Sequence, residues 1–193
     1  RSGLKPLIIS RGYGRKGPAL AVVSDGAKVL STPAEAGDEP YLIATRLKDV
    51  PVIVCADRVR AAAYGIENFK PDCVILDDGF QHVRLKRDIN IVLIDGHRGF
   101  GNGYLLPRGI LREPISRLRD ADIALVKGGR LKEADSARFG ALMLPVMGFE
   151  YAPTAFIDLT DDATLSIDEF KAAFNEKEAI AVCGIANPES FVM

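Results

Sequence analysis

Short, almost uninterrupted apolar runs recur along the sequence, and their length constrains the fold more than any other feature. Each run is four to six residues long, which suits a strand rather than a helix, and polar or glycine-rich turns follow. The runs cover residues 6–10, 19–24, 50–55, 73–76, 89–94, 123–126, 155–159 and 179–183. The sequence therefore predicts a series of strands joined by turns and helices.

Helical stretches lie between several of these runs. They cover residues 38–48, 57–68, 113–118 and 167–175. Pro40, Asp57 and Ser166 are residues that helices favour in the first turn or at the N-cap. The alternation predicts an α/β fold: a mostly parallel sheet with helices on both faces, in which runs 50–55, 73–76, 89–94 and 123–126 are buried on both faces. Ligands bind at the carboxyl ends of such strands, so chemistry is expected just after each run.

Composition excludes some classes of protein. The net charge of −1 over 193 residues shows no basic excess, so we expect no nucleic-acid partner. The three cysteines form no CxxC pair, which argues against a structural zinc site. A connector at residues 148–154 separates a core lobe, residues 1–147, from residues 148–193, which we interpret as a linker and part of a smaller lobe.

The strongest chemical signal is the segment CVILDDG, residues 73–79. An apolar strand delivers Asp77 and Asp78 at its carboxyl end, and a glycine then lets the chain turn. Two adjacent carboxylates offer the hard oxygen ligands that Mg²⁺ prefers. A strand end with two capping aspartates explains the pattern equally well. Gln81 and His82, which follow directly, favour the metal and phosphate interpretation.

A second signal is AGDEP, residues 36–40. Asp38 and Glu39 stand at a predicted helix start, where one of them can serve as a general base or lie near the metal. The alternative is a purely structural role, because acidic residues at a helix N-terminus stabilise it by about 0.3–1 kcal/mol.

Two glycine-rich loops follow predicted strands. Residues 10–17, SRGYGRKG, are basic and suit contact with phosphate, although the GxxxxGK[ST] pattern of a Walker A loop is absent from the whole chain. Residues 99–114 carry aromatic and arginine side chains and suit an anionic, partly apolar substrate. A flexible surface turn and an Ω-loop are the respective alternatives.

Six segments, in order along the chain, resemble the tetraacyldisaccharide 4′-kinase family, the lipid A 4′-kinases of Gram-negative bacteria. They are SRGYGRK (10–16), AGDEPYLIA (36–44), VCADRVRAA (54–62), LDDGFQHVRLKRDINIVLID (76–95), FGNGYLLPRGILREPISRLRDAD (100–122) and GIANPESF (184–191). The specific element is DDGFQH followed by FGNG, LLP and LREP. The short motifs taken singly are weak.

The resemblance implies a P-loop-NTPase-like fold with a smaller carboxy-terminal α/β lobe. It implies transfer of the γ-phosphate of ATP, with Mg²⁺, to the 4′-hydroxyl of a tetraacyldisaccharide 1-phosphate in lipid A biosynthesis. The expected partners are that acylated lipid and the cytoplasmic face of the bacterial inner membrane, and we expect a monomer.

The resemblance also assigns roles to single residues. Asp38 matches the catalytic base, and Glu39 accompanies it. Asp77 and Asp78 match the acidic pair of the Walker B position, which holds the metal, and Asp78 is also assigned to catalysis. The positions matched to substrate or phosphate contacts are Ser10, Tyr13, Arg58, Gln81, His82 and Arg112.

Three parts of the family pattern are expected outside the chain: the Walker A loop, an amphipathic membrane segment before Arg1, and a DHH-type motif after Met193. Ala186 also stands where the family often has glycine. We therefore expect the 193-residue chain to be inactive by itself. Two other functions stay open, a non-catalytic nucleotide-binding module and a P-loop kinase of a soluble substrate.

Overall fold

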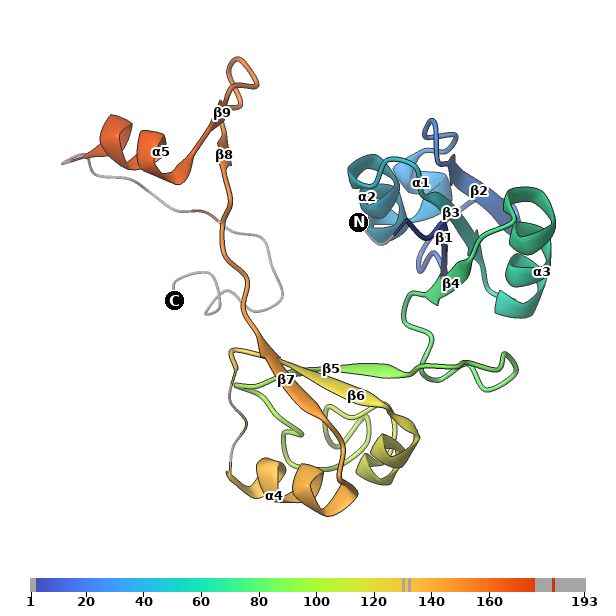
Figure 1. The fold of residues 1–193 in the computed structure, drawn as a ribbon, viewed down its shortest axis with the longest axis vertical. Coiled ribbons are helices and arrows are strands. Elements are labelled where there is room, and N and C mark those ends of the chain that lie inside the picture. The colour runs from blue at the N-terminus through green and yellow to red at the C-terminus, as the bar shows by residue number, and fades with distance from the viewer. Residues whose placement is uncertain (1–2, 130, 132, 176–181, 183–193) are drawn as a thin grey trace.

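In the computed structural model, residues 3–129, 131, 133–175 and 182 are described (Figure 1). The first unit is a four-stranded sheet in the order β2-β3-β1-β4. Strands β1 (Pro6–Ser10), β3 (Pro51–Cys55) and β4 (Cys73–Leu76) are parallel. Strand β2 (Leu20–Asp25) pairs antiparallel with β3 at one edge.

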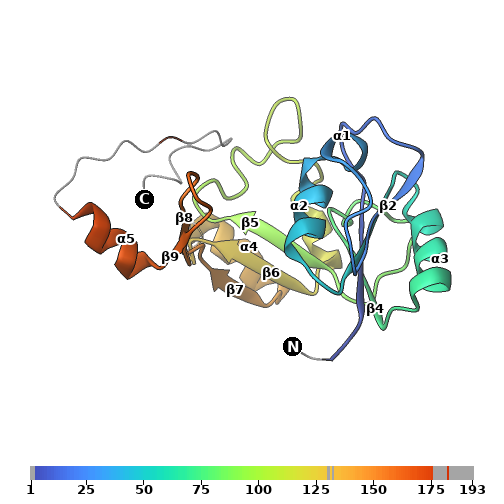
Figure 2. The ribbon, with the colours of Figure 1, turned by 90° about the horizontal axis from the view of Figure 1, so that it is seen from above.

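Helices cover both faces of this sheet, as the sequence predicts (Figure 2). On one face lie α1 (Pro33–Ala36) and α2 (Asp38–Arg46), and on the other lies α3 (Arg58–Phe69). Alternate strand residues point to opposite faces. Those that pack with α3 are Leu7, Ile9, Ile53 and Cys55, and those that pack with α1 and α2 are Ile8, Val23, Val52 and Val54. Each fully buried large aliphatic side chain contributes about 1.5–3 kcal/mol to stability.

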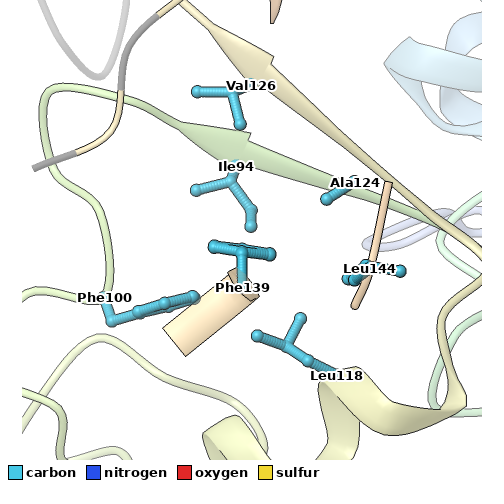
Figure 3. Close-up of a cluster of buried hydrophobic side chains, with 7 residues drawn as sticks. All are labelled: Ile94, Phe100, Leu118, Ala124, Val126, Phe139 and Leu144. Atoms are coloured by element: carbon cyan, nitrogen blue, oxygen red, sulfur yellow. The ribbon is translucent and has the colours of Figure 1, made fainter. Parts of the chain in front are cut away.

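A second sheet contains three parallel strands in the order β5-β6-β7. They are β5 (Ile91–Asp95), β6 (Ile123–Lys127) and β7 (Val146–Phe149). The 3₁₀ helix η1 (Ile115–Asp120) and helix α4 (Glu133–Leu142) pack against one face. Figure 3 shows the resulting core of Ile94, Phe100, Leu118, Ala124, Val126, Phe139 and Leu144.

The last described elements form a small unit. Strands β8 (Phe156–Ile157) and β9 (Thr164–Leu165) pair antiparallel, and α5 (Ile167–Phe174) follows. Ser166 caps α5 through a capping box, which confirms the predicted N-cap. The ring of Phe170 stacks on Phe156 with a centroid distance of 3.7 Å. Among the helices that the structure describes, none has the length and apolar character that crossing a bilayer requires.

Two predictions about the sheets are wrong. A single, mostly parallel sheet was expected, but the described strands form three sheets: a four-stranded sheet with one antiparallel edge strand, a three-stranded parallel sheet and the antiparallel pair β8-β9. The runs at β4 and β5 were expected to be buried on both faces, yet Ile75, Ile91 and Leu93 are 50%, 48% and 64% exposed. The physical reason is position, since α1 and α2 pack over β2 and β3 without covering β4, and no described helix covers the second face of β5.

Other elements also differ from the expected ones. The sequence reasoning missed α1, α4 and β7, because α1 is a single turn, α4 has little amphipathic pattern and β7 contains Gly148. The run at 179–183 lies outside the described residues except for Val182. The division into residues 1–147 and 148–193 stays a prediction; β7 crosses that boundary.

Candidate active site

The parallel strands β1, β3 and β4 end at one edge of the first sheet, and the predicted site residues follow these ends. Ser10 is the last residue of β1 and Arg58 opens α3 after β3. Asp77 directly follows β4, and its N–H donates to the carbonyl of Ile9 at 2.9 Å. This bond continues the sheet pairing by one residue, so the first carboxylate is anchored to β1.

The segment Asp77–His82, called the acidic turn below, is tightly folded. Asp78 has a φ of +48°, a left-handed conformation that aspartate tolerates better than most residues. The N–H of His82 donates to the carbonyl of Gly79 at 2.9 Å and closes the turn. The backbone that carries the Asp77 and Asp78 carboxylates is therefore held in one conformation.

Arg112, in the loop of residues 99–114, forms hydrogen bonds with the acidic turn. Its two Nη atoms donate to the two carboxylate oxygens of Asp78 at 3.0 and 2.6 Å, and Nη2 also donates to Oε1 of Gln81 at 2.7 Å. The Arg112 and Asp78 side chains are 50% and 59% exposed. The predicted phosphate-binding arginine and the predicted metal ligand are thus each other's partners in this structure.

A third carboxylate, that of Glu39 on helix α2, lies near enough to the acidic turn to interact with its charges. The negative charge of Asp77 raises the pKa of Glu39 above its usual range, with burial and the charge of Asp78 acting in the same direction. Asp38, one residue earlier, is exposed at the start of the helix. The carboxylates of Glu39, Asp77 and Asp78 therefore repel one another, and a bound cation would reduce this repulsion.

The glycine-rich loop of residues 10–17 packs on the start of helix α2. Gly37 has a φ of +91°, and a Cβ at this position would lie 3.3 Å from the Cα of Gly12. The N–H of Lys16 donates to the carbonyl of Ala34 at 2.8 Å, which ties the loop to α1. The loop is therefore a hydrogen-bonded part of the site edge, and its contact with α2 fixes where Asp38 begins the helix.

Arg58 lies buried beneath the edge. Its Nη1 donates to the carbonyl of Ala56 at 3.1 Å, while Nε has no partner among the described residues. Burial lowers the pKa of the guanidinium and the charge of Arg11 adds to this effect, whereas Asp78 and Asp77 oppose it. A cation with an unused donor beside two aspartates suits a phosphate or carboxylate ligand.

The surroundings of His82 disfavour its charged form. Burial lowers its pKa below 6.5, and the charges of Arg58 and Arg84 act in the same direction against that of Asp57. Its Nε2 is buried with no partner among the described residues. A neutral imidazole with an unpaired nitrogen can donate to or accept from a ligand, depending on its tautomer.

The loop of residues 99–114 has a fixed internal structure. Asn102 donates from Nδ2 to the carbonyl of Arg108 at 2.9 Å, and the Arg108 guanidinium lies 3.7 Å from the centre of the Tyr104 ring. Of the two arginines in this loop, Arg108 and Arg112, Arg112 is the one with hydrogen bonds to the acidic turn. A cleft of about 1620 Å³ borders Asp77, Asp78 and Arg112 and is lined further by β4 and β5.

Comparison with known proteins identifies the family. Residues 1–193 match the family model of the tetraacyldisaccharide-1-P 4′-kinases, LpxK. The chain belongs to this family. The tetraacyldisaccharide 4′-kinase of Syntrophus aciditrophicus is 42% identical over 98% of the chain, and that of Pseudomonas putida strain GB-1 is 40% identical over 98%. The chain spans only 53% and 52% of these two relatives, about half of their length.

A solved structure supports the same family assignment. The chain superposes on LpxK from Aquifex aeolicus with a TM-score of 0.67 and 33% sequence identity. The match covers 86% of this chain and 50% of that one. That crystal structure is described as an "apo" form in complex with ATP. The parallel α/β architecture is therefore shared with an LpxK protein.

The structure gathers most of the residues expected from the LpxK resemblance. Those at the common edge, by direct contact or by charge, are Glu39, Arg58, Asp77, Asp78, Gln81, His82 and Arg112. Ser10 is buried at the end of β1, where its hydroxyl accepts from the N–H of Gly12 at 3.5 Å. Tyr13 is 91% exposed, and Asp38 makes no side-chain hydrogen bond within the described part of the chain. No cluster of three or more potential metal ligands is found among the described residues.

One residue of this LpxK-family chain was overlooked in the sequence. Arg87 donates to two backbone carbonyls of the acidic turn, those of Gly79 and His82. It lies in the matched segment of residues 76–95, within the basic stretch RLKRD. That stretch was the available signal, but nothing in the spacing says which of its three cations folds back on the turn.

Proposed function

We propose that the whole protein containing this chain transfers the γ-phosphate of ATP to the 4′-hydroxyl of a tetraacyldisaccharide 1-phosphate in lipid A biosynthesis. The observation that carries the proposal is the meeting of the acidic turn, Glu39 and two arginines at one strand edge, in a chain that matches the LpxK family throughout. The proposal concerns the whole protein, because the chain spans about half of its relatives.

The acidic edge suits a divalent cation. Glu39 lies near enough to Asp77 and Asp78 for their charges to raise its pKa, so three carboxylates interact at this edge, where Arg58 and Arg112 supply positive charge. Mg²⁺ is commonly held by one or two carboxylates together with substrate phosphates. We assign Asp77 and Asp78 to hold it. When bound, Mg²⁺ would neutralise charge on the β- and γ-phosphates of ATP.

The protein's own groups then have separate roles. Asp38, exposed at the start of α2, accepts the proton of the 4′-hydroxyl, with Glu39 beside it. Arg58 and Arg112 neutralise phosphate charge, and Arg112 exchanges its contact with Asp78 for one with the ligand. Contacts with the substrate are assigned to Ser10, Tyr13, Gln81 and His82.

The setting of the reaction follows from the lipid. A substrate with four acyl chains resides in a membrane, and we place the protein at the cytoplasmic face of the bacterial inner membrane. We further propose that it acts as a monomer, with residues 1–147 in the core lobe and residues 148–193 in a linker and part of a smaller lobe.

The role of Asp38 is tested with Asp38→Asn in the whole protein. We expect kcat to fall about 10²–10⁴-fold while the KM for ATP changes little, because only proton acceptance is removed. Asp168→Asn is the matched control, since Asp168 also lies in the first turn of a helix, α5, away from the site edge. A kcat close to that of the wild type would remove Asp38 from the mechanism.

The choice of acceptor separates the proposal from its rivals. Labelled ATP is offered with the acylated disaccharide 1-phosphate, with soluble sugars and with no acceptor, and the 193-residue chain alone is assayed in parallel. Transfer to the lipid alone supports the proposal. Transfer to soluble sugars indicates a kinase of a soluble substrate, and nucleotide binding without transfer indicates a non-catalytic module.

A further inference from the structure

Arg87 connects the acidic turn to the second sheet. Its Nη1 donates to the carbonyl of Gly79 at 3.3 Å and also to the carbonyl of His82. Its Nε donates to Oδ1 of Asn90 at 2.5 Å. The guanidinium is half-buried, and these three oxygens are its partners among the described residues.

Asn90 is itself fixed to the second sheet. Its N–H donates to Oδ2 of Asp122 at 2.7 Å, and its carbonyl accepts from the N–H of Asp122 at 2.9 Å. These two residues immediately precede β5 and β6. Through Asn90, Arg87 therefore links the second sheet to the acidic turn, which lies in the irregular segment of residues 77–90.

The turn requires such support. Asp78 holds a positive φ, and its carboxylate would be released from Arg112 when that arginine turns to a ligand. The remaining backbone bonds of the acidic turn join Asp77 to Ile9 and His82 to Gly79. A guanidinium can satisfy three acceptors in one plane, which an ammonium group cannot do with the same geometry.

We propose that Arg87 is a positioning residue, which holds the acidic turn through its backbone carbonyls so that Asp77 and Asp78 stay aimed at the reacting phosphates. The catalytic part rests on the proposed function. Arg87 has no ion pair with either aspartate in the described structure, so it acts on the backbone and leaves the carboxylates to their ligands.

The first measurement needs no activity. Amide hydrogen exchange of residues 77–82 is followed in the 193-residue chain and in the whole protein, for wild type, Arg87→Lys and Arg87→Gln. We expect exchange of the Asp77 and His82 amides to accelerate about 10-fold or more, since each amide opens when the turn loosens. Lys86→Gln is the matched control, because it removes the same charge from the adjacent, exposed position.

The second measurement is kinetic. In the whole protein Arg87→Lys should lower kcat about 10–100-fold with less than about a threefold change in the KM for ATP, because misplaced carboxylates weaken the transition state. Added guanidinium ion should partly restore kcat in Arg87→Ala. Asn90→Ala, which leaves both carbonyl contacts possible, should give a smaller loss in the same direction.

The outcomes are distinct. Unchanged exchange in Arg87→Lys and Arg87→Gln shows that Arg87 does not hold the acidic turn, and faster exchange with normal kcat overturns its positioning role. If the wild-type protein phosphorylates none of the acceptors, the proposed function fails while the exchange data still decide whether Arg87 holds the turn. A variant that unfolds is recognised by its thermal transition, and Asn90→Ala then supplies the decisive comparison.

Discussion

Replacing Arg112 by glutamine should separate two effects that the structure joins in one ion pair. Arg112 neutralises Asp78 through two hydrogen bonds at 3.0 and 2.6 Å. Removal of the guanidinium frees the Asp78 carboxylate for a cation and at the same time removes the group that we propose to bind phosphate. Cation binding should therefore strengthen while phosphoryl transfer weakens.

The size of the first effect follows from exposure. With side chains 50% and 59% exposed, the pair falls in the class worth about 0.2–1 kcal/mol. This free energy corresponds to a gain in cation affinity of up to about 5-fold, since 1.4 kcal/mol is a factor of ten. The free energy of unfolding should fall by no more than about 1 kcal/mol. The second effect is larger, because loss of one charge-stabilising donor typically lowers kcat about 10²–10³-fold.

The gain in cation affinity is measured as binding of Mn²⁺, followed by electron paramagnetic resonance without nucleotide. Arg108→Gln is the control, because it removes the same charge from the same loop but Arg108 lies over Tyr104 and away from the acidic turn. Tighter Mn²⁺ binding in Arg112→Gln than in Arg108→Gln is expected. Equal or weaker binding would refute the view that Arg112 and a cation compete for Asp78.

Three further outcomes are expected. The pKa of Glu39 is raised above its ordinary value of 4.5, so the folded state binds more protons than the unfolded state as pH rises above 4.5, and the ionised carboxylate then lowers the free energy of unfolding. Glu39→Gln should therefore resist urea better than wild type near pH 7.5, with no difference near pH 4. Burial and the charges of Arg58 and Arg84 lower the pKa of His82 from the ordinary 6.5, so its imidazole NMR signals should titrate below that pH; a higher midpoint would contradict this lowering of the pKa. Gly37→Ala should destabilise the protein by about 1–3 kcal/mol in thermal unfolding, because φ is +91° and the added Cβ approaches Gly12; an unchanged transition would argue against the tight loop contact.

Much of the site was predictable because parallel strands carry their carboxyl ends to one edge. The apolar runs ending at Ser10, Cys55 and Leu76 identified β1, β3 and β4, and the residues after each run include Arg58, Asp77 and Asp78. The prediction needed no knowledge of strand order. The local pattern did not distinguish a site role for Glu39 from a structural one, because a helix N-terminus alone explains its charge. In the structure it lies close enough to Asp77 for the two charges to interact.

The unpredicted part consists of contacts that are distant in sequence or depend on backbone geometry. Arg112 meets Asp78 across 34 positions, and no periodicity encodes such a pairing. Arg87 recognises carbonyls, which every residue carries, so its partners leave no trace in residue types. The exposure of Leu93 likewise depends on which elements cover β5, a property of packing rather than of the apolar run.

The Arg112–Asp78 pair also bears on how ligands would bind together. A cation alone satisfies Asp78 but leaves Arg112 with Gln81 and no carboxylate partner, and a metal-free nucleotide satisfies Arg112 but leaves Asp78 without its cationic partner. A ligand that carries both a divalent cation and phosphates replaces both halves of the pair at once. Metal and nucleotide should therefore bind more tightly together than their separate affinities imply, and Arg112→Gln should reduce this coupling, measured by calorimetry as the change in ATP affinity on adding Mg²⁺. Coupling unchanged by Arg112→Gln would show that it arises from the metal–nucleotide complex alone and that the ion pair has no part in it.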